Sequence, residues 1–150
     1  MSLAPNEYRY HIVLFMVRGQ RPPSKHQHMA APIVCGAGGD TGHRRFLNQS
    51  QRDTVKQLFD RIVIERGGEA LFVESTVAWL RALIRVPWLV NIDGVTDAVR
   101  TLATKHLAKK GWARGESVFT SHARVYDVPP EQAAWVLAEL TRSATEKREP

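Results

Sequence analysis

Three breaks in the chain limit its fold more than any other sequence feature. Gly67–Gly68, Pro87 and Gly111 divide residues 50–111 into three segments, and each segment carries apolar residues at helical spacing. A glycine pair ends a helix readily, and the residue before a proline resists the helical backbone conformation. The pattern therefore predicts three helices, over residues 51–66, 75–85 and 94–110.

The third predicted helix has clear signals at both ends. Asp97 suits the positive end of the helix dipole, while Lys109 and Lys110 suit its negative end. Gly111 is the residue type that commonly follows a last turn, and Trp112 can then pack back onto the helix. The helix should bury a stripe formed by Val95, Ala98, Val99, Leu102, Ala103 and Leu107.

Strand signals flank these segments. Residues 8–17, YRYHIVLFMV, are rich in aromatic and β-branched side chains and predict a strand. Two short β-prone runs, residues 117–119 and 124–128, surround a polar turn and predict a hairpin. The two prolines that follow open a last predicted helix over residues 131–141. The expected order after residue 50 is helix, helix, helix, hairpin, helix.

This order resembles that of winged helix-turn-helix DNA-binding domains, over about residues 50–141. The segment VTDAVRTLATKHLAKKGWARGESVFTSHARVYDVP is similar to the part of those domains where a recognition helix leads into a basic hairpin, the wing. The connection at residues 86–93 is longer than the three or four residues of the usual turn. The resemblance implies an α+β, mainly helical fold, with a winged-helix-like three-helix core, a C-terminal β-hairpin and a following helix.

Composition divides the chain into three parts. Residues 18–32 are polar and hold three prolines, so residues 1–49 are expected to form an N-terminal arm or strand with a flexible linker. Residues 50–141 form the expected winged-helix-like domain, and residues 142–150 an expected frayed tail.

The chain is basic, with a net charge of +6 and a sequence pI of about 9.9, which favours an anionic partner. Residues 98–115 hold five Lys or Arg and no Asp or Glu. Cations there would neutralise phosphates, and threonine hydroxyls can reach bases or phosphates. We therefore predict nucleic-acid binding, with duplex DNA as the expected form, in transcriptional, replication or mobile-element regulation. The predicted contacts are Arg100, Thr101, Thr104, Lys105, Lys109, Lys110, Arg114 and Arg124.

The four tryptophans leave a second interpretation open. Tryptophan is enriched at protein interfaces, so the chain could instead be a protein-interaction module or a structural subunit of a larger assembly. Trp135, Val136 and Leu140 on the last predicted helix could also support a homodimer.

No sequence pattern predicts a catalytic, cofactor or metal site. This favours a protein that is not an enzyme. Residues 36–42, GAGGDTG, lack the third glycine of a dinucleotide fingerprint. His26, His28, Cys35 and His43 are zinc-type ligands, but only the first two are closely paired. Cys35 as a nucleophile with His43 as its base would lack an orienting group.

The single cysteine is typical of a reducing, cytoplasmic setting. No apolar run reaches the roughly 18–20 residues of a membrane span, so no membrane partner is expected.

Overall fold

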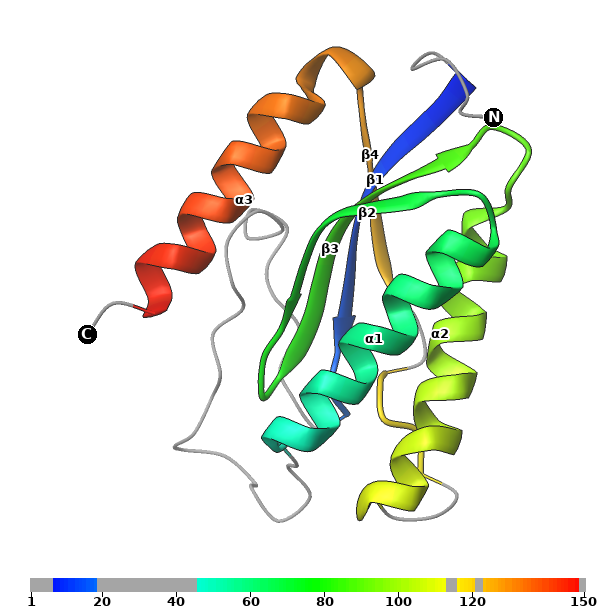
Figure 1. Ribbon diagram of the computed structural model, residues 1–150, viewed down its shortest axis with the longest axis vertical. Helices are drawn as coiled ribbons and strands as arrows, with labels where there is room; N and C mark the ends of the chain where they lie inside the picture. The colour runs from blue at the N-terminus through cyan, green and yellow to red at the C-terminus, as the bar shows by residue number, and fades with distance from the viewer. Residues whose placement is uncertain (1–6, 19–45, 113–115, 121–122, 149–150) are drawn as a thin grey trace.

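The computed structural model describes residues 7–18, 46–112, 116–120 and 123–148. Within these residues, one four-stranded antiparallel sheet in the order β2-β3-β1-β4 is packed against three helices (Figure 1). The strands are β1 (Tyr8–Met16), β2 (Glu69–Ser75), β3 (Trp79–Pro87) and β4 (Arg124–Val128). The helices are α1 (Gln49–Glu65), α2 (Ile92–Leu107) and α3 (Ala133–Arg148), with short 3-10 turns η3 (Ala108–Lys110) and η4 (Pro130–Gln132).

β1 lies between β3 and β4 and is buried along almost its whole length. It pairs with β3 from Tyr8 to Met16 and with β4 from Tyr10 to Leu14. A strand that is covered on both faces needs apolar side chains at successive positions, which explains the run IVLFM. The predicted strand at residues 8–17 is confirmed.

Local signals define both ends of α1. The Asn48 side chain accepts a hydrogen bond from the backbone N–H of Gln51, and the Gln51 side chain accepts one from the backbone N–H of Asn48, both at 2.9 Å. This reciprocal capping box begins the helix. After its last turn, Gly67 has a φ of +81°, and a Cβ on Gly68 would lie 2.4 Å from the Arg85 carbonyl oxygen. Glycine is therefore required at both positions of this turn into β2.

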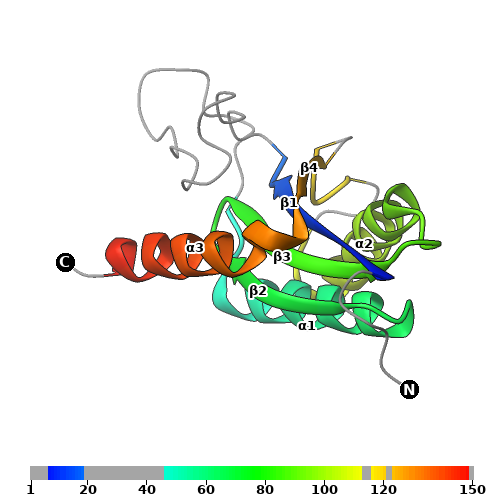
Figure 2. The same cartoon turned by 90° about the horizontal axis from the view of Figure 1, so that it is seen from above.

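α1 and α2 lie side by side on one face of the sheet, and α3 lies on the other (Figures 1 and 2). Phe15 of β1 packs in the first layer against Phe59 of α1 and Phe119, with ring centroids 6.2 and 5.1 Å away. Val136 and Leu140 of α3 form the second layer with side chains of β1, β3 and β4. Each face of the sheet thus has its own apolar core.

The predicted winged-helix-like fold is wrong, because residues 75–85 contribute most of β3 and form no helix. β3 lies between β2 and β1, so its apolar side chains serve both layers. Leu80 and Ile84 face α1 and α2, while Leu83 faces α3. A short apolar run that is buried on two sides cannot be distinguished from a buried helix by its periodicity. Pairing with β1 and β2 decides its conformation.

The predicted C-terminal hairpin is also wrong. β4 pairs with β1, and Phe119 forms an isolated bridge with Val17. α3 then follows β4 through η4. The helices predicted at residues 51–66 and 94–110 are confirmed, the first as α1 and the second as α2 with η3. The βαββαβ order from β1 to β4 is that of ferredoxin-like folds, extended here by α3.

Candidate nucleic-acid interface

α1 begins and α2 ends at the same end of the molecule, the lower end in Figure 1. Gln51 donates a hydrogen bond from Nε2 to the Lys110 carbonyl oxygen at 3.0 Å, and Lys110 donates from Nζ to Ser50 Oγ at 3.3 Å. These contacts join the first turn of α1 to η3. We call the resulting surface the basic end. It consists of Ser50, Arg52, Lys105, Lys109 and Lys110.

Positive charge is concentrated at the basic end. The first turn of α1 carries no acidic side chain, and a helix N-terminus contributes partial positive charge of its own. Lys105, Lys109 and Lys110 are exposed. Arg52 donates from Nη1 to the Leu47 carbonyl oxygen at 2.8 Å, which holds its guanidinium beside this turn. Helix N-termini are suited to binding phosphate, so the arrangement can contact a phosphate backbone.

A tight helix end supports these lysines. Gly111 has a φ of +94°, and Trp112 donates its backbone N–H to the Leu107 carbonyl oxygen at 2.9 Å. The Trp112 side chain is 4% exposed, packs in the α1–α2 layer and donates from Nε1 to the Glu116 carbonyl oxygen at 3.1 Å. This is the Schellman arrangement that the glycine predicted. Trp112 therefore has a structural role in positioning the end of α2.

Three of the predicted contact residues lie on the basic end, namely Lys105, Lys109 and Lys110. Thr101 is exposed on α2. Sequence reasoning missed Ser50 and Arg52 because they belong to another helix, and Ser50 meets Lys110 only through the contact between α1 and η3. The lack of an acidic residue in the first turn of α1 is the sequence signal that could have identified them.

Two other predicted contacts on α2 are engaged within the fold. The Thr104 hydroxyl donates to the Arg100 carbonyl oxygen and accepts from the Val118 backbone N–H, both at 3.1 Å. It therefore holds the segment at residues 116–120 against α2. The half-buried Arg100 side chain lies 3.3 Å from the Asp97 carboxylate, which offsets part of its charge.

Arg124 lies on the face of the sheet opposite α2. It is paired with Leu14, while the next residue, Val125, packs against the α1–α2 layer. Side chains alternate between faces along a strand, so Arg124 and the lysines of α2 do not share one surface. Arg114 lies outside the described residues, as do the loop at residues 36–42 and the zinc-type ligands His26, His28, Cys35 and His43.

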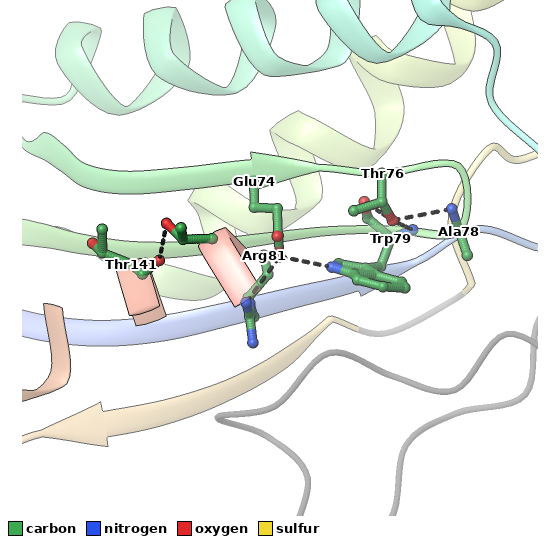
Figure 3. Close-up of polar contacts among 7 residues, drawn as sticks. Glu74, Thr76, Ala78, Trp79, Arg81 and Thr141 are labelled. Atoms are coloured by element: carbon green, nitrogen blue, oxygen red, sulfur yellow. Dashed lines mark hydrogen bonds and ion pairs between the residues drawn. The ribbon is translucent and has the colours of Figure 1, made fainter. Parts of the chain in front are cut away.

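A buried ion pair lies on the α3 side of the sheet, near Thr141 of α3 (Figure 3). Arg81 of β3 is fully buried, and its Nη2 lies 2.9 Å from Oε1 of Glu74 on β2. The same oxygen accepts a hydrogen bond from Trp79 Nε1 at 3.2 Å. Burial lowers the pKa of Arg81, and the Glu74 carboxylate opposes this shift. Arg81 falls within the helix predicted over residues 75–85, but it lies in a central strand of the sheet.

A cleft of about 480 Å³ adjoins both the buried ion pair and the basic end. α1 lines one side of it with Arg52, Asp53 and Lys56, and the turn between β2 and β3 lines the other. An extended polar ligand that contacts Arg52 therefore has room to continue along this cleft.

A second polar pair lies where β1 begins. His11 has a side chain that is 3% exposed, and its Nδ1 lies 2.9 Å from Oδ1 of Asp127, whose side chain is 90% exposed. The atoms are close enough for an ion pair, although they do not meet the geometry of a hydrogen bond. Burial lowers the pKa of His11 below 6.5, and the nearby Asp127 charge only partly opposes the shift.

The stability of the fold should depend on pH through His11. Because its folded pKa lies below the value of about 6.5 in an unfolded chain, the unfolded state binds more protons as the pH falls. The contribution of His11 to the free energy of unfolding is therefore complete above about pH 6.5 and is lost as the pH falls through the folded pKa. Urea unfolding between about pH 7.5 and pH 5 should show this decline.

Two variants test the origin of the decline. Asp127→Asn removes the opposing carboxylate, so it should lower the folded pKa of His11 further and extend the decline to lower pH. His11→Leu should flatten the profile. An unchanged profile in His11→Leu would show that another group causes the pH dependence.

Trp135 is the exposed member of the predicted dimer surface on α3. Its side chain is 61% exposed, while Val136 and Leu140 are buried against the sheet of the same chain. In the part of the chain that the structure describes, no three His, Cys, Asp or Glu side chains are placed to hold a metal ion. None of the described helices combines the length and the apolar character needed to cross a bilayer.

No protein-family model and no curated protein sequence matches this chain. Among solved structures, its fold is similar to that of a "putative transposase" from Deinococcus radiodurans R1, with a TM-score of 0.50 and 15% sequence identity. The match covers 90% of this chain and 89% of that chain. The likeness therefore concerns the fold, and it extends over nearly the whole of both chains.

Proposed function

We propose that this chain binds nucleic acid, with DNA as the expected form, by holding the phosphate backbone on the basic end. The observation that carries the proposal is the contact of Lys110 with Ser50 and Gln51. It joins the acid-free first turn of α1 to Lys110, which follows the exposed Lys109 in η3 and lies about one turn beyond the exposed Lys105 of α2. A phosphate between them would meet a helix N-terminus on one side and ammonium groups on the other.

The residues of the basic end have separate roles in this proposal. Lys105, Lys109 and Lys110 neutralise phosphates, and the Ser50 hydroxyl donates a hydrogen bond to a phosphate oxygen. Thr101 lies on the exposed side of α2 and extends the contact. Contacts of this kind set affinity and position without reading base sequence. The similar fold of a protein described as a "putative transposase" supports DNA as the partner and a role connected with mobile elements.

The salt dependence of binding tests this proposal. Fluorescence anisotropy with a labelled duplex should show a steep loss of wild-type affinity between roughly 50 and 200 mM salt, because bound counterions are released from the phosphates. Lys109→Glu/Lys110→Glu should weaken binding by about tenfold or more and reduce the logarithmic salt slope by about two.

Arg61→Glu/Arg142→Glu is the matched control. It makes the same change in net charge at two exposed arginines away from the basic end, with side chains 59% and 62% exposed. This control should retain most of the affinity. Equal losses in the two double variants would mean that net charge alone drives binding, and the basic end would not be the site.

A protein-interaction role is the second candidate, and the exposed Trp135 on α3 is the observation that favours it. Association with a protein partner through this indole would depend on apolar contact and would be weakly affected by salt.

A further inference from the structure

Gln51 is a buried polar residue in the first turn of α1, and its side chain makes contacts in two directions. Its Oε1 accepts a hydrogen bond from the backbone N–H of Asn48 at 2.9 Å, and its Nε2 donates to the Lys110 carbonyl oxygen at 3.0 Å. Only 5% of the residue is exposed. Gln51 therefore links the start of α1 to η3 from within the fold and offers almost no surface of its own to a ligand.

The capping box of α1 does not by itself require glutamine at this position. Glutamate and glutamine both serve as the third residue of a capping box, because each offers a side-chain oxygen to the backbone N–H of the N-cap residue. An ionised glutamate has only acceptors, whereas the amide of glutamine also carries two N–H donors. The bond to the Lys110 carbonyl oxygen needs a donor. The contact with η3 is thus the feature that distinguishes Gln51 from a glutamate.

The side chains of η3 contribute little to the core, so hydrogen bonds matter for its position. Ala108 is half-buried, and Lys109 and Lys110 are exposed. The last carbonyl groups of a helix have no partner within it, and Gln51 supplies one for the carbonyl group of Lys110. The Nζ of the same lysine donates to Ser50 Oγ at 3.3 Å. Lys110 is therefore held to α1 through both its backbone and its side chain.

We propose that Gln51 is a positioning residue for nucleic-acid binding at the basic end. It holds Lys110, and with it the adjacent Lys109, beside the first turn of α1, so that ammonium groups and the N-terminus of the helix can meet the same phosphate backbone. Without this bond η3 can move away from α1, and the lysines lose their fixed position. The inference rests on the proposed function, because the affinity that it concerns is that of the basic end.

The first experiment compares two variants that carry the same added charge. Gln51→Glu keeps the capping-box oxygen but loses the donor to Lys110, whereas Gln49→Glu adds a carboxylate to the same turn and leaves Gln51 intact. In anisotropy measurements with a labelled duplex at about 0.15 M salt, Gln51→Glu should bind about fivefold more weakly than Gln49→Glu. A phosphate contact with a salt slope of about −0.9 contributes roughly this factor relative to 1 M salt. Equal affinities of the two variants would overturn the inference.

The second experiment separates positioning from helix capping without a change in charge. Gln51→Met removes both hydrogen bonds of the side chain, whereas Asn48→Ala removes the other half of the capping box and leaves the Gln51 amide able to donate to Lys110. Both variants should lower the thermal midpoint. Only Gln51→Met should weaken duplex binding, by about fivefold, and reduce the logarithmic salt slope by about one. An equal loss of affinity in Asn48→Ala would overturn the inference, because Gln51 would then act only as part of the cap.

A measurement without nucleic acid shows whether the turn itself moves. The backbone amide signals of Lys110, Gly111 and Trp112 in NMR spectra of the full chain should shift in Gln51→Glu and Gln51→Met. The same signals should stay in place in Gln49→Glu, which keeps the bond between Gln51 and Lys110. Unmoved signals in both Gln51 variants would contradict the inference, because η3 would then keep its position without this bond.

The inference and the proposed function fail in different ways. If Lys109→Glu/Lys110→Glu weakens duplex binding while the Gln51 variants bind like their controls, the basic end stands and Gln51 has no positioning role. If the lysine variant binds duplex as tightly as the wild type, the proposed function fails, and this inference fails with it. Gln51→Glu keeps the cap, so its thermal midpoint should stay close to that of Gln49→Glu and confirm that both variants are folded.

Discussion

Replacing Arg81 with methionine is expected to lower the free energy of unfolding by about 3–5 kcal/mol, the usual cost of breaking a buried ion pair. Arg81 is fully buried and Glu74 is 5% exposed, so Arg81→Met leaves a carboxylate inside the fold without its cation. An ion pair on the surface would contribute only about 0–1 kcal/mol, so the measurement distinguishes the two situations. Urea unfolding followed by circular dichroism gives the value.

A double variant shows whether the loss comes from the stranded charge. Glu74→Gln/Arg81→Met removes both charges but keeps an amide oxygen that can accept the hydrogen bond from Trp79. Uncharged replacements of buried pairs are often neutral or stabilising, so the double variant should recover most of the stability that Arg81→Met loses. If the double variant is as unstable as Arg81→Met, the packing of the arginine side chain, for example over Phe72, causes most of the loss of stability.

A chain that begins at Phe46, and therefore lacks β1, is expected to show no cooperative unfolding transition. β1 lies between β3 and β4, so its removal separates β4 from the β2–β3 pair. Ile12, Leu14 and Phe15 are each at most 2% exposed, and burying one such side chain contributes about 1.5–3 kcal/mol. Most of the nine residues of β1 are buried, so the summed free energy of burying their side chains reaches the total stability of about 5–15 kcal/mol of a typical domain.

Phe15→Ala in the full chain is the graded control for this truncation. It should remain cooperative while losing about 3–5 kcal/mol, because Phe15 packs against Phe59 and Phe119 in the α1–α2 layer. A sharp urea transition in the truncated chain would show that residues 46–150 fold alone, as the predicted domain at residues 50–141 suggests.

The helices and strands that the sequence predicted correctly are those with local signals. α1 ends at a glycine pair, and α2 ends in a lysine-rich turn closed by Gly111. β1 was recognisable from its run of β-branched and aromatic residues. β3 was not, because an apolar segment of nine residues fits either a buried strand or a buried helix.

The candidate site could be predicted only in part for the same reason. The lysines at the end of α2 are close together in the sequence and stood out as an acid-free run. Their neighbour Ser50 comes from another helix, and Arg124, which sequence order grouped with them, is on the opposite face of the sheet.

The sequence by itself determined the positive charge of the chain, the C-terminal ends of α1 and α2, and the strand character of β1. Caps, glycine turns and charge act over a few residues of the backbone, so they can be recognised without knowing the fold. Only the tertiary structure decided that β3 is a strand, that β4 pairs with β1, and that Arg81 is buried. Strand pairing and burial depend on contacts between residues far apart in the chain, and those contacts override local preference.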